Sequence, residues 1–229
     1  MLRVDTVIDG KPSVITGTGI FIGKGEDTYI VTASHVAKAM SSKSSIIFKA
    51  KNDVPVKLNL NQLVTDGAIH WKNSEKADVA VLKIDPPQKF WDNGLFQNRF
   101  MPIALLYDSL KSISRETPLT VFGFPLGLGL DGFFSPLTYR SFPSSGLITL
   151  PRFDNGKLSS FILLENPSVG GYSGGPVFDM GLVDEGNIQF IRPKGTFCYG
   201  IVHGTISDLT GGKIAAITPA FYILELLMK

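Results

Sequence analysis

The sequence predicts an all-β fold, a sandwich or a barrel, and three observations lead to this prediction. Short apolar runs rich in Ile, Val, Phe and Tyr recur along the chain, which is typical of β-strands. The 24 glycines and 14 prolines fall between these runs and predict turns. A helical pattern is convincing in one place, near the C-terminus. The expected strands are 20–22, 29–32, 45–48, 79–84, 119–122, 161–164 and 199–202.

The C-terminal helix is expected to begin with Thr218 as its N-cap and Pro219 at its first position, where a missing N–H costs nothing. We expect one apolar face of this helix to pack on the body of the protein, and a helix that binds a partner is the alternative. The apolar residues repeat at helical spacing, at Ala220, Leu224, Leu227 and Met228.

Length and composition bound the remaining possibilities. A chain of 229 residues fits one domain, or two closely packed lobes, and we place the crossing at 105–118, between lobes at 1–108 and 109–229. With 22 basic against 20 acidic residues and no clustered basic face, the sequence does not predict nucleic-acid binding. No apolar run approaches the ~20 residues of a transmembrane helix. Cys198 is the one cysteine and residues 1–14 hold no apolar run, so we expect a reducing, cytoplasmic location.

Ser173 lies in the glycine-rich segment 170–176, Gly-Gly-Tyr-Ser-Gly-Gly-Pro. A nucleophilic hydroxyl needs a tight turn whose backbone N–H groups point at one spot, and glycine permits such a turn. The N–H groups of Gly171 and Ser173 are the expected oxyanion hole, and a plain turn is the alternative. The segment also matches Gly-x-Ser-x-Gly, but that motif requires an acid and a histidine after the serine and a following helix. Here Pro176 leads into a strand pattern instead.

Two upstream residues are possible partners of this serine. His35 follows the β-rich run 30–34, and Asp78 stands at the start of the apolar strand expected at 79–84. Each alone has an ordinary structural interpretation, a histidine at a strand end and an acid in a turn or cap.

Together, these three segments resemble the trypsin-like serine proteases. That family carries Thr-Ala-Ala-His, Asp-Ile-Ala-Leu and Gly-x-Ser-Gly-Gly-Pro in this order, and here the segments are 32–35, 78–81 and 171–176. The motif pattern is closest to the HtrA-type protease domain, which Gly-Phe-Pro-Leu-Gly at 123–127 and Ser-Gly-Leu-Ile at 145–148 resemble. The resemblance implies a chymotrypsin-like fold of two six-stranded antiparallel β-barrels with a short C-terminal α-helix.

The resemblance also implies a serine endopeptidase that acts on a polypeptide substrate through an acyl-enzyme. His35 would accept the proton of Ser173, and Asp78 would hold the tautomer of His35. No metal or organic cofactor is required. A catalytically latent or inactive binding module on the same fold, and an esterase, are the alternatives.

The specificity pocket is implied by the same resemblance. Its floor is expected near Pro167 and its wall at His203, Gly204 and Thr205, with an apolar or small side chain accepted at the cleavage site. The family residue at the position of His203 normally donates a hydrogen bond to the catalytic Asp. His203 is therefore either a fourth member of that network or a structural or rim histidine.

Activation departs from the digestive members of the family. They insert a new N-terminus against an Asp immediately before the serine, and that position is Tyr172 here. The oxyanion loop is therefore either preformed or ordered by something else. The apolar insertion 130–144 could be a gate, a surface for an activating partner, a membrane-touching patch, or a loop folded onto the second barrel. We expect no peptide-binding PDZ domain, which HtrA-type proteins usually add.

Overall fold

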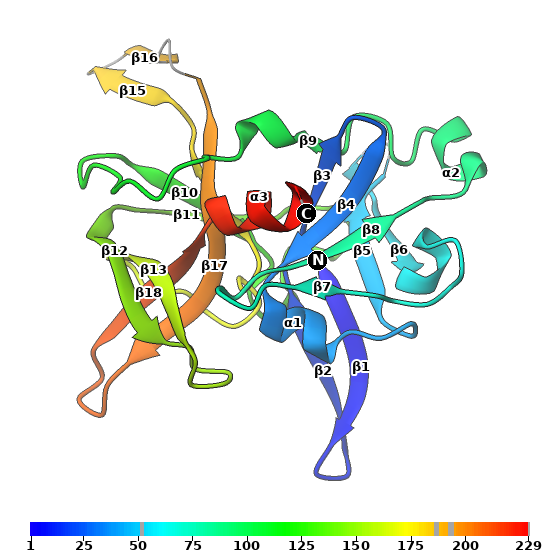
Figure 1. The fold of residues 1–229 in the computed structure, drawn as a ribbon. Helices are drawn as coiled ribbons and strands as arrows, with labels where there is room; N and C mark the ends of the chain where they lie inside the picture. Colours follow the sequence, from blue (N-terminus) through cyan, green and yellow to red (C-terminus); the bar gives the residue numbers. More distant parts are fainter. Residues whose placement is uncertain (51–52, 186–187, 192–194, 229) are drawn as a thin grey trace.

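Strands that bury alternate side chains on opposite faces organise the chain into two lobes in the computed structural model, which describes residues 1–50, 53–185, 188–191 and 195–228 (Figure 1). The first lobe holds α1 (Ser34–Ala39) and α2 (Gln88–Asp92). Its strands are β1 (Leu2–Ile8), β2 (Lys11–Gly17), β3 (Ile20–Lys24), β4 (Asp27–Thr32), β5 (Ser45–Lys49), β6 (Pro55–Asn59), β7 (Lys72–Asn73), β8 (Ala80–Ile84) and β9 (Met101–Pro102).

The second lobe follows the crossing segment and ends in α3 (Phe221–Met228). Its strands are β10 (Leu119–Gly123), β11 (Leu137–Ser141), β12 (Pro143–Pro151), β13 (Leu158–Leu164), β14 (Pro176–Asp179), β15 (Leu182–Glu185), β16 (Ile188–Ile191), β17 (Phe197–Ser207) and β18 (Lys213–Pro219). Each strand run expected from the sequence falls within one of the observed strands, apart from Val79, which directly precedes β8.

Hydrogen bonding groups these strands into sheets of unequal size. The first lobe contains the orders β2-β1-β5-β6 and β7-β8-β4-β3-β9, and the second contains β11-β10-β14-β17-β18-β13-β12 with a separate β15-β16 hairpin. The all-β, chymotrypsin-like fold expected from the sequence is confirmed. The expected six strands per barrel are not how the described strands pair, because β7 and β9 add two-residue edges to the first lobe and the second lobe closes through one seven-stranded sheet.

Neighbouring side chains of the central strands of the first lobe point in opposite directions, so one set packs inside this lobe and the other packs against the second lobe. In β4, Ile30 packs into the core of the first lobe, whereas its neighbour Val31 packs into a second core that also receives Ile201 of β17 and Ile223 of α3. Leu106, in the crossing segment, forms a parallel bridge with Cys198 of β17. Figure 1 shows α3, in red, between the two lobes. The lobes therefore share one interface core, which the terminal helix seals.

The terminal helix begins later than the sequence predicted. Thr218 and Pro219 are the last residues of β18, where they pair with Ile201 and Gly200, so the predicted N-cap at Thr218 is wrong. Backbone hydrogen bonds to β17 keep these residues in the sheet, so the helix begins at Phe221. The buried face also differs, since Met228 is exposed whereas Ile223 is fully buried. Across the described ranges, no helix is long and apolar enough to cross a membrane.

The apolar insertion 130–144 is largely part of the body of the protein. Residues 137–141 form β11, which pairs with β10 along its whole length. Phe134 packs against Phe124, with ring centroids 5.1 Å apart, and its N–H donates to the carbonyl of Asp53 in the first lobe. Phe133 remains exposed. The segment therefore ties the two lobes together, and its Phe133 and Phe142 side chains are exposed.

Candidate active site

His35 is presented by the first turn of a short helix. β4 ends at Thr32 and α1 begins at Ser34, so the chain turns sharply and places the His35 ring at the junction of the lobes. The ring is largely buried, and its Nδ1 lies 2.7 Å from Asp78 Oδ2. The His35 backbone N–H also donates to Asp78 Oδ1, at 3.1 Å. Because Nδ1 is engaged with a carboxylate, the other ring nitrogen, Nε2, is left as the proton acceptor.

Asp78 is fully buried immediately before β8 and receives hydrogen bonds on both carboxylate oxygens. Oδ2 accepts from the rings of His35 and His203, and Oδ1 accepts from the His35 N–H and from Arg152. Burial alone would raise the pKa of Asp78, but the hydrogen bonds from His203 and His35 outweigh it and hold the pKa well below its usual range. The carboxylate is therefore ionised and fixed in orientation.

His203 reaches Asp78 because of a β-bulge. In β17, Val202 pairs with Ile217 and Gly204 pairs with Ala216, which leaves His203 as the extra residue. A bulge re-aims the side chain it inserts, and here the ring turns inward until its Nδ1 lies 2.5 Å from Asp78 Oδ2. Of the two interpretations left open by the sequence, the structure shows the histidine that joins the Asp78 network.

The spacing of this cluster is that of hydrogen bonds. His35, Asp78 and His203 are the kind of residues that bind metals, and their ligand atoms lie within 4.8 Å of one another. However, the carboxylate oxygen lies 2.7 and 2.5 Å from the two ring nitrogens. Ligands on a tetrahedral zinc, with bonds of ~2.0–2.1 Å, sit roughly 3.3 Å apart, so these contacts fit shared protons.

Ser173 lies beside this cluster on the turn that leads into β14. Its Oγ donates to the backbone carbonyl of His203, at 3.1 Å. Within the described ranges, no hydrogen bond joins Ser173 to His35. The structure therefore brings the three expected catalytic residues to one site, with His203 touching both the serine and the aspartate, while the serine hydroxyl faces a carbonyl.

The two expected oxyanion donors are free. The carbonyl of Gly170 accepts from the N–H of Leu126, and the carbonyl of Tyr172 accepts from the N–H of Gly175. In a trans peptide the N–H points opposite to the C=O, so the N–H groups of Gly171 and Ser173 are directed away from these anchors. Neither donates to another part of the described chain. Gly171 has φ +104, and a Cβ there would collide with the carbonyl of Phe124, so this position requires glycine.

Hydrogen bonds from Thr18 and burial of the Tyr172 ring fix the loop that contains Gly171 and Ser173. The Thr18 hydroxyl donates to the Gly171 carbonyl at 2.7 Å and accepts from the Phe124 N–H at 3.1 Å. The Thr18 N–H also donates to the Ser173 carbonyl. Tyr172, where digestive relatives need an Asp, buries its ring in the core of the second lobe, 5.0 Å from Tyr139. The loop is therefore ordered by contacts within the chain.

A pocket of about 230 Å³ opens beside Ser173. Gly204 and Thr205, both expected from the sequence, line it, together with Phe153 and the segment 168–170. Pro167 does not line it, because the residues after it turn inward, where the Thr205 hydroxyl donates to the Ser168 carbonyl at 2.6 Å. The His203 ring does not line it either, since it is buried against Asp78.

A second pocket, of about 650 Å³, lies on the other side of Gly170 and Gly171. Leu126 and Val14 stand exposed at its rim. Met1, Ile47 and Leu130 add apolar surface, and Arg3, whose guanidinium is paired with Asp5, supplies charge. The two pockets share Gly170 in their lining, and Ser173 lines the smaller one.

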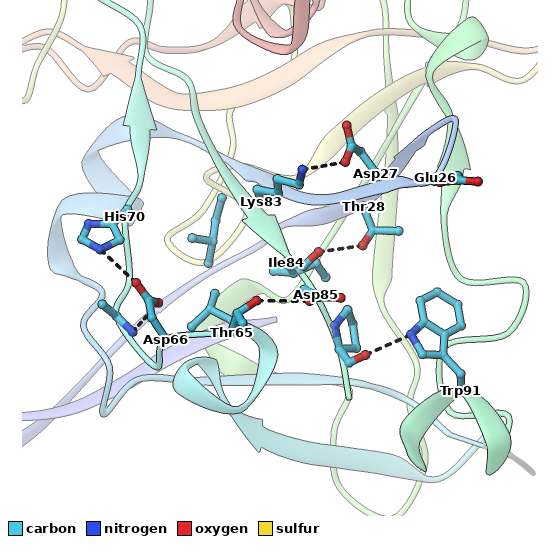
Figure 2. Close-up of a pocket in the computed structure, with 14 residues that line it drawn as sticks. Glu26, Asp27, Thr28, Thr65, Asp66, His70, Lys83, Ile84, Asp85 and Trp91 are labelled. Atoms are coloured by element: carbon cyan, nitrogen blue, oxygen red, sulfur yellow. Dashed lines mark hydrogen bonds and ion pairs between the residues drawn. The ribbon is translucent and has the colours of Figure 1, made fainter. Parts of the chain in front are cut away.

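A larger cavity, of about 750 Å³, lies away from this site in the first lobe, and Figure 2 shows its polar lining. Three of its four carboxylates are engaged with neighbours: Asp27 with Lys83, Asp66 with His70, and Asp85 with the Thr65 hydroxyl. Trp91 donates its ring N–H to the carbonyl of Pro86. These groups satisfy one another, so the cavity offers no comparable reactive arrangement.

Comparison with known families identifies the fold family. The model of the trypsin-like peptidase domain matches residues 17–181, which is most of the chain and includes the three expected catalytic residues. The chain belongs to the trypsin-like peptidase domain family. Comparison with curated proteins gives no match.

Two solved structures resemble this trypsin-like domain. The MamO protease domain from Magnetospirillum magneticum, in its apo form, is 15% identical, with a TM-score of 0.56 over 91% of this chain and 86% of that chain. A glutamic acid specific serine protease that utilizes a histidine triad in substrate binding is 12% identical, with a TM-score of 0.50 over 99% of this chain and 95% of that chain. At these identities the likeness concerns the fold.

Sequence reasoning missed three residues of the site. Thr18 lies inside a Gly-Thr-Gly run directly before the strand expected at 20–22, and such a run has no functional signal of its own. Arg152 and Phe153 lie in the β12–β13 turn, which folds over the His35 ring with the Phe153 ring centroid 4.9 Å away. The Asn155-Gly156 pair is a recognisable hairpin signal, but nothing in the sequence marks the lobe that the hairpin touches.

Proposed function

We propose that this trypsin-like domain is a serine endopeptidase that hydrolyses peptide bonds through Ser173, His35 and Asp78. The observation that carries the proposal is the His35–Asp78 pair, whose 2.7 Å contact fixes Nδ1 as donor and leaves Nε2 available as the base. The coarser assignment, a protease of the trypsin-like family, rests on the family match. The motif pattern favours the HtrA-type subgroup within that family.

The reaction is acyl transfer. Ser173 Oγ turns from the His203 carbonyl toward His35 Nε2, attacks the substrate carbonyl and loses its proton to His35. His35 then delivers that proton to the departing amine, and an acyl ester remains on Ser173. Water, deprotonated by His35, releases the acid product. Hydrogen bonds to catalytic groups are often long or misdirected before substrate binds, so the resting position of the hydroxyl is compatible with this path.

The free N–H groups of Gly171 and Ser173 would stabilise the oxyanion. One such donor typically contributes ~2.7–4 kcal/mol to transition-state stabilisation. Their carbonyl partners are already bonded in the resting structure, so no inserted N-terminus is required to orient them.

The two pockets beside Ser173 suggest how a polypeptide lies in the site. The side chain before the scissile bond would enter the 230 Å³ pocket, whose small volume and the nearby Phe153 ring favour a small or apolar residue. The residues after the bond would cross Gly170 toward the 650 Å³ pocket. Because His203 is committed to Asp78, we do not propose a glutamate-specific pocket.

A latent protease, or an inactive module on the same fold, is the second candidate. It is favoured by one observation, the Ser173 hydroxyl that donates to a carbonyl instead of to His35. In a latent enzyme an activating partner would have to redirect this hydroxyl. The exposed Phe133 in the 130–144 segment is the contact that we propose for such a partner.

Labelling with a fluorophosphonate probe tests the proposal, because such a probe needs an activated serine and no knowledge of the substrate. Intact mass and peptide mapping should show one adduct on Ser173 in the wild type and none in Ser173→Ala. A folded protein that takes no adduct would contradict an active hydrolase and support the latent candidate. A peptide library then separates an endopeptidase from an esterase, since an esterase would leave every peptide intact.

A further inference from the structure

Arg152 is a buried arginine that crosses from the second lobe to the expected catalytic acid of the first. It follows the end of β12, on the turn that covers the His35 ring, and only 4% of the residue is exposed. An arginine is almost never buried so completely unless its donors are paired. The partners of this guanidinium therefore indicate why it lies there.

The guanidinium bridges two carboxylates and one carbonyl. Nη2 donates to Asp78 Oδ1 at 2.7 Å and to Asp154 Oδ2 at 2.8 Å, and Nε donates to Asp154 Oδ1 at 2.7 Å. Nη1 donates to the carbonyl of Ala77 at 3.1 Å. Arg152 thus grips the residue before Asp78 as well as the carboxylate itself. It binds the carboxylate oxygen that the ring of His35 does not use.

The charges that face His35 come from four elements. Asp78 contacts the ring directly, and His203 shares the same carboxylate oxygen from β17. Arg152 and Asp154 come from the β12–β13 turn, and Lys38 of α1 itself pairs with Asp154 at 3.3 Å. Arg152 also pairs with Asp78 and Asp154 also pairs with Lys38, so removing either member of the Arg152–Asp154 pair changes the net charge near the His35 imidazole by one unit.

We propose that Arg152 is a positioning residue that fixes Asp78 and lowers the proton affinity of His35, which rests on the proposed function of that site. A carboxylate beside a histidine stabilises the imidazolium and makes the ring a stronger base. The guanidinium on the opposite oxygen offsets part of this effect.

A purely structural role is the alternative, in which Arg152 only joins the two lobes. Both roles predict that loss of Arg152 weakens the fold and the activity. The two roles differ in the titration of His35, because a residue that only joins the lobes is not expected to set the pKa of His35. The experiment therefore measures the pKa of His35 directly.

The chain has three histidines, so isotope-labelled histidine gives a simple NMR spectrum that can be titrated without any substrate. The His70 and His203 signals are assigned with His70→Gln and His203→Gln, and the remaining signal is that of His35. The first variant is Arg152→Met, which removes the charge at similar volume. Arg152→Lys keeps the charge but loses the planar guanidinium, and Asp154→Asn leaves Asp78 as the one carboxylate paired with Arg152. Arg140→Met, at an exposed arginine of β11, is the matched control.

We expect the pKa of His35 to rise in Arg152→Met, which removes a nearby positive charge, and to fall in Asp154→Asn, which removes a nearby negative charge. It should stay near the wild-type value in Arg152→Lys and Arg140→Met. The labelling rate of Ser173 should drop by about 10- to 100-fold in both Arg152 variants, since a shifted Asp78 misplaces the base. Arg140→Met should label at the wild-type rate.

An unchanged His35 pKa in Arg152→Met would overturn the proposal. If that variant does not fold, an unchanged or raised pKa in Asp154→Asn would overturn it instead. Neither result depends on hydrolysis. A protein that never labels at Ser173 would contradict the proposed function, whereas the titration of His35 would still test the proposal for Arg152.

Discussion

The two ends of the candidate site are held in different ways. At the acid end, Asp78 is fully buried, and its oxygens accept hydrogen bonds from side chains of both lobes. At the nucleophile end, Ser173 is partly exposed, and its hydroxyl makes one hydrogen bond, to the His203 carbonyl. The loop around the serine is fixed through its backbone, by Thr18, Leu126 and Gly175.

This difference suggests a division of labour. A buried charge needs every partner in place before substrate arrives, because rearranging charges in a low-dielectric site is costly. A hydroxyl is neutral and can turn about one bond at little cost. The protein therefore fixes the Asp78 carboxylate and leaves the Ser173 hydroxyl free to rotate. Substitutions at the acid end should lower activity and stability more than substitutions at the nucleophile end.

The largest effect is expected for Asp78→Asn. An amide cannot accept from every donor that now meets Asp78, and its NH₂ would favour the wrong His35 tautomer, so kcat/KM should fall about 10⁴-fold. The buried Arg152 would also lose its partner, which should lower the free energy of unfolding by about 3–5 kcal/mol. Labelling kinetics and urea unfolding measure the two losses, with Asp131→Asn at an exposed position as the control.

The pH dependence of that stability difference follows from the lowered pKa of Asp78. A carboxyl whose pKa is lower in the folded than in the unfolded state stabilises the fold above its unfolded value, about 4. As the pH falls below that value and toward the folded pKa, the contribution is lost. The gap in unfolding free energy between wild type and Asp78→Asn should therefore narrow as the pH falls below about 4. A gap that widens on acidification would contradict the assignment.

The contrast between the two ends also explains what the sequence could predict. Ser173, His35 and Asp78 stand in local patterns of glycine, strand and turn, so both the patterns and their order are visible in one dimension. Arg152 is different, because its role depends on a hairpin of the second lobe folding over the first. The inward turn of His203 depends on a bulge, which is set by pairing with β18.

The fold shows the same limit at the terminal helix. The strands were predictable from apolar runs and turns, because each run buries one face locally. Thr218 and Pro219 were assigned to the helix, since local propensity favours capping there. In the folded chain the longer pairing between β17 and β18 competes for the same residues and prevails. Long-range pairing therefore decided the element boundary.

A smaller effect is expected at the nucleophile end for Thr18→Val, which keeps the shape of the side chain. The Gly171 carbonyl and the Phe124 N–H would both lose their buried partner, at a cost of about 1–3 kcal/mol in unfolding free energy. The oxyanion loop should loosen, and fluorophosphonate labelling of Ser173 should slow about tenfold. Thr138→Val, at an exposed site on β11, is the control. Unchanged labelling in a destabilised Thr18→Val would mean that the hydroxyl supports the fold but not the oxyanion donors.

The smallest effect is expected just beyond the serine, for Leu126→Asn. Leu126 is 74% exposed at the rim of the 650 Å³ pocket and has φ +54, a conformation that asparagine tolerates better than leucine. The substitution should therefore preserve the fold, keep the N–H that holds Gly170, and remove apolar surface only where the departing part of a substrate would lie.

The measurement for Leu126→Asn is the partitioning of the acyl-enzyme. Ser173 is acylated with a p-nitrophenyl ester of a small N-acyl amino acid, and leucinamide and glycinamide then compete with water for the acyl group. In Leu126→Asn, transfer to leucinamide should fall about 3- to 10-fold relative to glycinamide, while release of p-nitrophenol stays unchanged. Equal loss with both amides would show that the pocket does not read the side chain after the scissile bond. A slower release of p-nitrophenol would show instead that Leu126 acts through the Gly170–Gly171 backbone, and that the nucleophile end extends further than the hydrogen bonds around Ser173 indicate.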